Sequence, residues 1–179
     1  MPRPLVAKND PVLHTISSDV EMPFTQEEMG PFLKDMWDTM YAAKGIGLAA
    51  VQIGFPVRIA VLDVKGLKYV LINPIVVSHS DTYTKLPEGC LSLPGKVVQR
   101  IPRYERVEIQ SFNEFGHSYG LVATGLLARC IQHELDHMNG VLISERARKG
   151  IMGHDFTEAG QKETKILKPQ GEWVEIDKW

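Results

Sequence analysis

The clearest hydrophobic pattern in the chain runs from Thr124 to Gly140 and predicts a buried α-helix. Thr124 is a typical N-cap residue, and Gly140 is typical of the position just beyond a helix end. The apolar side chains between them cover most of the circumference of a helix: Leu126, Leu127, Cys130, Ile131, Leu135 and Met138. A helix that is apolar on most sides is expected to lie inside the protein.

A second helical pattern begins at Thr25, where apolar residues recur every three or four positions. They are Met29, Phe32, Leu33, Met36 and Met40. Thr25 and Glu28 match a capping box, which favours a helix start at Thr25. Pro31 would remove a backbone hydrogen bond from that helix, so a start at Gly30 and Pro31 is the alternative. Gly45 is expected to end the helix.

Short segments rich in β-branched and aromatic residues predict strands through the middle of the chain. They cover residues 58–63, 68–73, 96–100, 105–112 and 117–122, with 75–77 and 81–84 as extensions of the sheet. Turns are expected at Lys65-Gly66 and at residues 113–116, and a break at Pro74. Pro87 and Pro94 bound a stretch that is expected to be an extended edge or a bulged segment.

The two ends of the chain carry weaker patterns. Residues 1–24 contain several prolines and are expected to form an extended arm on the body of the protein. Beyond Gly140 come a short apolar stretch at 141–143, a basic patch of Arg146, Arg148 and Lys149, and a last strand at 173–176. Together the elements predict an α+β fold in which mostly antiparallel β-sheets pack around one central helix.

Length, composition and charge narrow the class of protein. The 179 residues, 44% of them hydrophobic, fit a single domain over residues 1–179, with a tail from about residue 147. No apolar run of about 18 residues and no signal-peptide region are present, so we expect a cytoplasmic protein without a membrane partner. A net charge of −2 gives no general attraction to nucleic acid, so no specific nucleic-acid partner is expected.

The central helix carries the pattern H-E-x-x-H at His133, Glu134 and His137. Residues four apart lie about 40° from each other on one helix face, so both imidazoles can bind one metal ion. Glu134 lies beside them and can reach a water on that ion without being a ligand. A surface helix can carry the same pattern by chance. In a buried helix, however, these side chains and Asp136 need strong partners, and a divalent metal ion is the obvious one.

A catalytic metal ion needs a third protein ligand, and Cys90 is the candidate that stands out. The common alternative is that Cys90 is a small buried thiol. Cys130 precedes His133 by three residues, points about 60° away from the metal face, and fits the apolar side of the helix. The remaining histidines lie in polar or turn-like surroundings and are expected to be solvated: His14, His79, His117 and His154.

Residues 45–54 form a second unusual stretch, with three glycines and two alanines. Small residues let the backbone run close to packed backbone or to a ligand. The spacing does not match a phosphate-binding loop. The local sequence alone indicates that Gln52 is an ordinary loop glutamine.

Three stretches, residues 45–52, 88–92 and 132–137, resemble the three motifs of the peptide deformylases, in the same order and at similar separations, within roughly residues 5–145. The resemblance implies roles for ten residues. They are the metal ligands Cys90, His133 and His137, the acid–base Glu134, the oxyanion contacts Gln52 (side chain) and Leu91 (N–H), and the substrate contacts Gly45, Ile46, Gly47 and Gly89.

The family removes the formyl group from the N-terminal formyl-methionine of new polypeptides, so the resemblance implies a single catalytic domain that acts on N-formyl-methionyl nascent peptides. It implies Fe²⁺ as the native ion, and a thiolate ligand also admits Zn²⁺, Ni²⁺ or Co²⁺. A transient ribosome contact is suggested too, although members that dock there use a long C-terminal helix and this tail contains Pro169-Gln170-Gly171. Many members also carry an arginine where this chain has Val97.

Two other functions stay open at the level of residues. A zinc endopeptidase shares the histidine–glutamate helix, but it usually takes its third ligand from beyond that helix, whereas Cys90 lies upstream. A metal-binding module without turnover would close the site with a fourth ligand, and the sequence offers no candidate for one.

Overall fold

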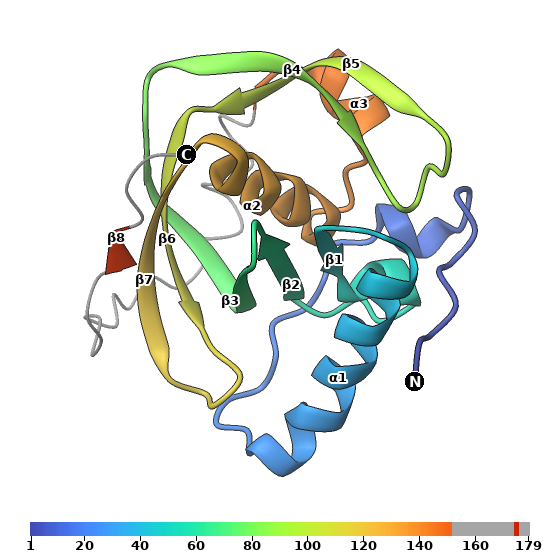
Figure 1. Cartoon of the computed structure of the whole chain (residues 1–179), viewed down its shortest axis with the longest axis vertical. Helices are drawn as coiled ribbons and strands as arrows, with labels where there is room; N and C mark the ends of the chain where they lie inside the picture. The colour runs from blue at the N-terminus through green and yellow to red at the C-terminus, as the bar shows by residue number, and fades with distance from the viewer. Residues whose placement is uncertain (152–173, 176–179) are drawn as a thin grey trace.

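The structure, a computed structural model, describes residues 1–151 and 174–175 (Figure 1). Its helices are α1 (Gln26–Ala42), α2 (Gly125–Met138) and α3 (Ile143–Lys149), with 3-10 turns η1 (Pro11–His14) and η2 (Ala50–Ile53). Its strands are β1 (Gly47–Ala49), β2 (Ile59–Val64), β3 (Leu67–His79), β4 (Tyr83–Gly89), β5 (Val97–Tyr104), β6 (Arg106–Phe112), β7 (Ser118–Thr124) and β8 (Val174–Glu175). Among the described residues, no helix is long and apolar enough to cross a membrane.

The strands form two sheets that lie on different sides of α2. One sheet has the order β1-β2-β3-β6-β7-β8 and the other pairs β4 with β5. All pairings are antiparallel except that of β7 with β8, where Leu121 lies opposite Val174. Figure 1 shows α2 in the middle of the molecule, with β4 and β5 on one side and β1, β2 and β3 on the other. The predicted mixture of helices and mostly antiparallel sheets is confirmed.

Strand β2 is buried on both faces because a helix covers each of them. Successive strand residues point to opposite faces. Ala60 and Leu62 pack in the same apolar cluster as Leu135 of α2, whereas Val61 packs in the cluster that contains Met36 of α1. Burial of a valine or leucine side chain such as Val61 or Leu62 contributes about 1.5–3 kcal/mol to folding. This packing fixes α2 and β1, which carry the motif residues, relative to each other.

Helix α1 follows the first of its two predicted starts, and the alternative at Gly30 is wrong. Thr25 caps the helix: the backbone N–H of Glu28 donates to its hydroxyl, and the backbone N–H of Thr25 donates to the Glu28 carboxylate at 2.8 Å. Pro31 lies inside the helix. It deprives the carbonyl of Glu27 of a partner, but Glu27 is exposed, so water can replace that bond. The helix ends at Ala42, before the predicted Gly45.

The predicted strand break at Pro74 is also wrong, since β3 runs through it. The register between β3 and β6 shifts between Ile72 and Ile75, so the proline lies in a bulge where it need not donate a ladder hydrogen bond. Asn73 supports the bulge from its side, because its amide donates to the carbonyl of Val20 and accepts from the N–H of Val20. The predicted extended or bulged segment from Pro87 to Pro94 holds only for its first part: residues 87–89 end the bulged strand β4, whereas residues 91–95 form turns and a bend.

Candidate metal centre and substrate pocket

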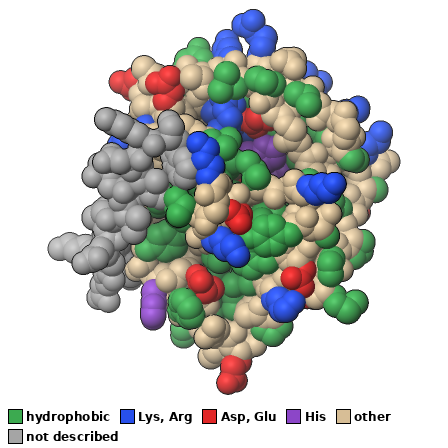
Figure 2. Space-filling model, in the orientation of Figure 1, with side chains coloured by type: hydrophobic (Ala, Val, Ile, Leu, Met, Phe, Trp, Pro, Cys, Tyr) green, Lys and Arg blue, Asp and Glu red, His purple; other side chains and the backbone are tan. Residues whose placement is uncertain are grey.

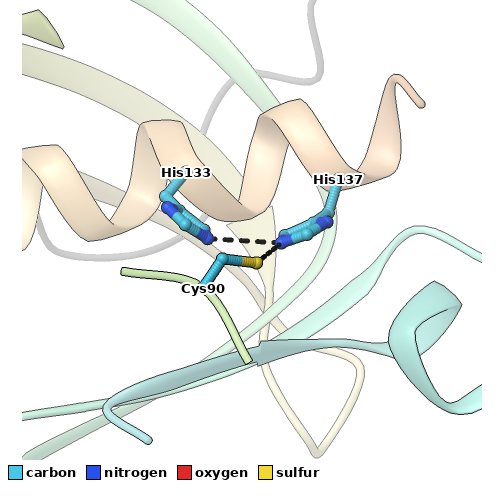
Figure 3. A group of neighbouring side chains, drawn as sticks. All are labelled: Cys90, His133 and His137. Carbon is cyan, nitrogen blue, oxygen red and sulfur yellow. Dashed lines mark hydrogen bonds between the residues drawn. The ribbon is translucent and has the colours of Figure 1, made fainter. Parts of the chain in front are cut away.

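Two histidines of α2 and the cysteine that follows β4 bring three donor atoms together (Figure 3). His133 and His137 lie about one helical turn apart, and their Nε2 atoms are 3.2 Å from each other. Sγ of Cys90 lies 3.3 Å from Nε2 of His137, although the two residues are 47 positions apart in the sequence. All three donor atoms lie within 4.8 Å of one another. The folded chain thus places the three predicted ligands side by side.

The spacing of these atoms fits a divalent metal ion. In a tetrahedral site with metal–nitrogen bonds of about 2.0 Å and metal–sulfur bonds of about 2.3 Å, neighbouring donors are roughly 3.3 to 3.6 Å apart. The separations of 3.2 and 3.3 Å are close to that range. Two imidazole nitrogens and a thiolate suit Fe²⁺, Co²⁺, Ni²⁺ and Zn²⁺, and three protein ligands leave a coordination position for water or substrate.

The electrostatics of the two rings differ. Burial lowers the pKa of His133, but the neighbouring Cys90 and Glu88 outweigh burial and raise it to about 10. Burial and the charge of His133 hold the pKa of His137 well below its usual value. The pKa values of the two rings are therefore shifted in opposite directions, although their Nε2 atoms lie only 3.2 Å apart. A divalent cation would accept the lone pairs of both Nε2 atoms.

Glu88, two residues before Cys90, fixes the orientation of His133. Its Oε1 accepts a hydrogen bond from Nδ1 of His133 at 2.9 Å, which turns Nε2 toward the other donor atoms. Arg103 donates to both Glu88 oxygens at 2.9 Å, and Arg129 donates at 2.6 Å. Burial raises the pKa of Glu88, but Arg103 and His133 outweigh burial and keep the pKa well below its usual range. Glu88 is therefore a carboxylate, with a role that the sequence analysis missed.

Asp136 departs from its sequence-based interpretation. A metal ion was the expected partner of this acid, but its carboxylate accepts from Arg103 at 2.6 Å and from Arg146 at 2.7 and 3.1 Å. The predicted basic patch is wrong for Arg146, which is only 1% exposed. Helix α3 packs against β5 and brings Arg146 to Asp136 of α2. Arg148 and Lys149 are exposed as expected.

Glu134 lies between the two histidines on α2 and is 3% exposed. A methyl group built on Gly47 would overlap its Oε1 and lie 2.9 Å from Cδ2 of Leu62, so glycine is needed where the two motifs meet. Burial raises the pKa of Glu134 to about 7, although the charges of His133 and Arg103 lower it. Its Oε2 is buried and has no hydrogen-bond partner among the described residues. This oxygen is available to a molecule in the site.

The side chain of Gln52 in η2 is held in one orientation. Its Oε1 accepts the backbone N–H of Ala49 at 2.9 Å, so its amide nitrogen must face the other way. That nitrogen donates to the hydroxyl of Ser92 at 3.0 Å and lies 3.9 Å from Sγ of Cys90. Leu91, directly after Cys90, is half-buried beside it. Sequence reasoning missed Ser92, although it lies inside the second motif.

A cavity of about 740 Å³ opens beside these side chains. All four predicted substrate contacts line it: Gly45, Ile46, Gly47 and Gly89. Figure 2 shows histidine at the base of a hollow on this face, with hydrophobic side chains around it. A methyl group on Gly45 would lie 2.6 Å from Cδ1 of Leu91, so the glycine-rich stretch closely approaches the second motif. Val97 also lines the cavity and is 63% exposed.

Cysteine and histidine residues outside the cluster follow their predictions where the structure describes them. Cys130 is buried in the apolar core around α2, and burial raises its pKa to about 12. It also lines the cavity, as a neutral thiol. His14, His79 and His117 are exposed, and His154 lies outside the described residues.

Comparison with known proteins adds independent observations. The family model for polypeptide deformylase matches residues 2–150. A peptide deformylase from Brucella suis biovar 1 (strain 1330) is 39% identical over an alignment of 152 residues that covers 82% of this chain and 85% of that protein. One from Chromobacterium violaceum is 44% identical over 140 residues, or 76% and 81% of the two chains.

Solved structures agree with the sequence comparisons. The crystal structure of a peptide deformylase from Legionella pneumophila superposes with a TM-score of 0.76 at 37% identity, covering 83% of this chain and 90% of that one. A peptide deformylase from Synechococcus elongatus, solved in complex with actinonin, gives 0.76 at 37% identity, covering 94% and 91%. The match to the family model and these relatives show that the chain belongs to the polypeptide deformylase family.

Proposed function

We propose that this deformylase hydrolyses the formyl group of N-terminal formyl-methionine in the 740 Å³ cavity, with Cys90, His133 and His137 as the ligands of one divalent metal ion. The observation that supports the proposal most is that three segments far apart in the sequence meet at one place. Cys90 comes from the segment after β4, the two histidines and Glu134 come from α2, and Gln52 comes from η2. When bound, such an ion lowers the pKa of a coordinated water and so provides a nucleophile near neutral pH.

Glu134 is proposed to move the proton. Hydrolysis forms a bond between the water oxygen and the formyl carbon and breaks the bond from that carbon to the peptide nitrogen. Glu134 accepts the proton of the attacking water and passes it to the departing amine, so formate and a free N-terminus result. Its buried Oε2, which has no partner among the described residues, supports this role. So does Gly47, which leaves room for the carboxylate.

Gln52 and the backbone N–H of Leu91 are proposed to stabilise the negative oxygen that develops on the formyl group. The amide nitrogen of Gln52 is turned toward Cys90 by the bond from Ala49, so this donor needs no reorganisation when charge develops. Ser92 is proposed to position Gln52 without touching the substrate.

The substrate is proposed to lie along the glycine-rich stretch. Gly45, Ile46 and Gly47 line the cavity. The two glycines have no side chains that would keep a peptide away from the backbone. Among the described strands, β1 has a neighbour, β2, on one side only, so a peptide can pair with β1 as an added strand. Gly89, at the end of β4, is proposed to contact the same peptide. Apolar residues of the cavity then receive the methionine side chain.

The identity of the ion and the setting of the enzyme are further proposals. We propose Fe²⁺ as the native ion, following the resemblance to the family. Zn²⁺, Ni²⁺ or Co²⁺ can replace it, because a thiolate with two imidazoles admits all four ions. We also propose one catalytic domain over the whole chain and a cytoplasmic location. We also propose a transient ribosome contact; the C-terminal segment that would make it lies outside the described residues.

The test of this function separates formamide hydrolysis from peptide-bond hydrolysis. Protein purified without oxygen and loaded with Fe²⁺ or Ni²⁺ is incubated with a formyl-methionyl peptide and, in parallel, with casein. Formate is expected from the peptide, and casein is expected to stay intact. Cleavage of casein without release of formate would instead support an endopeptidase.

Glu88→Gln is expected to weaken metal binding by about 10- to 100-fold, the usual cost of losing an outer partner of a ligating histidine. The amide keeps its size but cannot accept from His133 and both arginines as a carboxylate does. Affinity is measured by competition with a chelator. Glu27→Gln, at an exposed acid far from the cavity, is the matched control and should bind the ion like the wild type. An unchanged affinity in Glu88→Gln would show that His133 is oriented by other contacts.

A further inference from the structure

Two lysines face the mouth of the cavity from opposite segments. Lys44 lies between α1 and β1, and Lys96 lies between β4 and β5. Both are exposed, and both line the cavity. Within residues 1–151 and 174–175, neither side chain has a hydrogen bond or ion pair. Figure 2 shows Lys or Arg side chains at the edge of the central hollow. The two ammonium groups are therefore available to a peptide that passes between them.

The acids of the cavity do not neutralise these lysines. Among the described lining residues, only Glu88 and Glu134 are acidic, and they are 9% and 3% exposed. Arg103 and Arg129 already compensate the charge of Glu88. The mouth of the cavity therefore carries uncompensated positive charge. Ile46 and Val97 are exposed beside it, and such apolar walls strengthen a local electrostatic field.

The backbone at Lys44 points to a use for its side chain. Lys44 has a φ of 57°, in the left-handed region where glycine or asparagine costs less than lysine. Two hydrogen bonds hold this turn: the N–H of Lys44 donates to the carbonyl of Tyr41 at 3.0 Å, and the N–H of Gly45 donates to that of Met40 at 2.9 Å. A long cationic side chain is thus kept at a strained position on the rim.

We propose that Lys44 and Lys96 form a subsite for acidic side chains in the first residues after the formyl-methionine. This inference rests on the proposed function and deepens it by naming a substrate class. The formylated N-terminus is uncharged, so no charge at the reacting end competes with this recognition. The following residues leave the cavity past the two lysines, where an aspartate or glutamate gains an ion pair and a lysine or arginine is repelled.

The test compares three amidated peptides, formyl-Met-Ala-Glu, formyl-Met-Ala-Gln and formyl-Met-Ala-Lys, together with the set that carries these residues directly after methionine. An exposed ion pair changes an equilibrium by up to about fivefold. The varied residue lies beside the lysines in only one of the two peptide sets. In that set, we expect kcat/KM to favour Glu over Gln by about threefold to fivefold at low salt, with Lys lowest. The preference should disappear at about 1 M salt, where the Debye length is only about 3 Å.

Variants assign the preference to the two lysines. The double variant Lys44→Gln/Lys96→Gln should treat the three peptides alike, and Lys44→Glu/Lys96→Glu should prefer the Lys peptide. Lys149→Gln, at an exposed lysine of α3 outside the cavity, should keep the wild-type preference. A preference for Glu that survives in the double Gln variant would overturn the assignment.

The wild-type series also separates this inference from the proposed function. Release of formate at equal rates from all peptides at low salt would overturn the subsite and leave the deformylase activity intact. No formate from any peptide would overturn the proposed function, and the subsite with it.

Discussion

Glu134→Ala keeps the metal ion and loses about 10²- to 10⁴-fold in kcat, the range that general acid–base catalysis usually supplies. We expect the upper end of that range, because one carboxylate serves two proton transfers, from the water and to the leaving amine. Glu134 lies beside the ligands and is absent from the group of three donor atoms, so its removal should leave the ligand set complete. Metal content and rate are measured on the same sample.

A second variant, Glu134→Gln, tests the same role of Glu134. Glu134→Gln keeps the size of the side chain next to Gly47 but cannot accept a proton, so it should be as inactive as the Ala variant. Substantial activity in the Gln variant would mean that Glu134 acts only through hydrogen bonds. Loss of the ion from either variant would mean that Glu134 is a ligand.

Gln52→Glu is expected to lower kcat by about 10²- to 10³-fold, the typical cost of losing one oxyanion donor. Glutamate can still accept the N–H of Ala49, and the hydroxyl of Ser92 can donate to it. The local structure should therefore survive, while the N–H that faces the developing charge is gone. KM should change little, because the lost interaction forms mainly in the transition state. Steady-state kinetics with a formyl-methionyl peptide measure both parameters.

Ser92→Ala is the matched comparison for Gln52. It removes one hydrogen bond from the amide nitrogen but leaves that nitrogen in place, held by the bond from Ala49. A single hydrogen bond contributes about 0.5–1.5 kcal/mol, so the loss of rate should stay below about tenfold. A similar loss in both variants, with unchanged unfolding temperatures, would assign the oxyanion contact to the hydroxyl of Ser92 instead.

Local patterns predicted most elements of this fold because the relevant physics is local. The capping box at Thr25 and Glu28, the turn at Lys65-Gly66 and the apolar helix that ends before Gly140 all depend on neighbours within a few residues. The two errors at prolines have tertiary causes. Pro31 is tolerated because its lost bond falls on an exposed carbonyl, and Pro74 because a bulge takes it out of the ladder.

The candidate site shows the same limit. Spacing alone put His133 and His137 on one face, and their Nε2 atoms indeed meet. The partners of Asp136 could not be predicted, since Arg103 and Arg146 come from β5 and α3 and are brought to it only by the packing around α2. Glu88 was in view within the second motif, but nothing local shows that its carboxylate reaches a histidine 45 positions away.

The position of Cys90 relative to α2 would let a bound metal ion link activity to resistance to heat. One ion held by Cys90 and His137 would tie together residues 47 positions apart, as a clip across a long loop does. The unfolded chain cannot hold all three donors in that arrangement, so binding free energy becomes folding free energy. Conditions that strip such an ion would therefore remove catalysis and weaken the fold together.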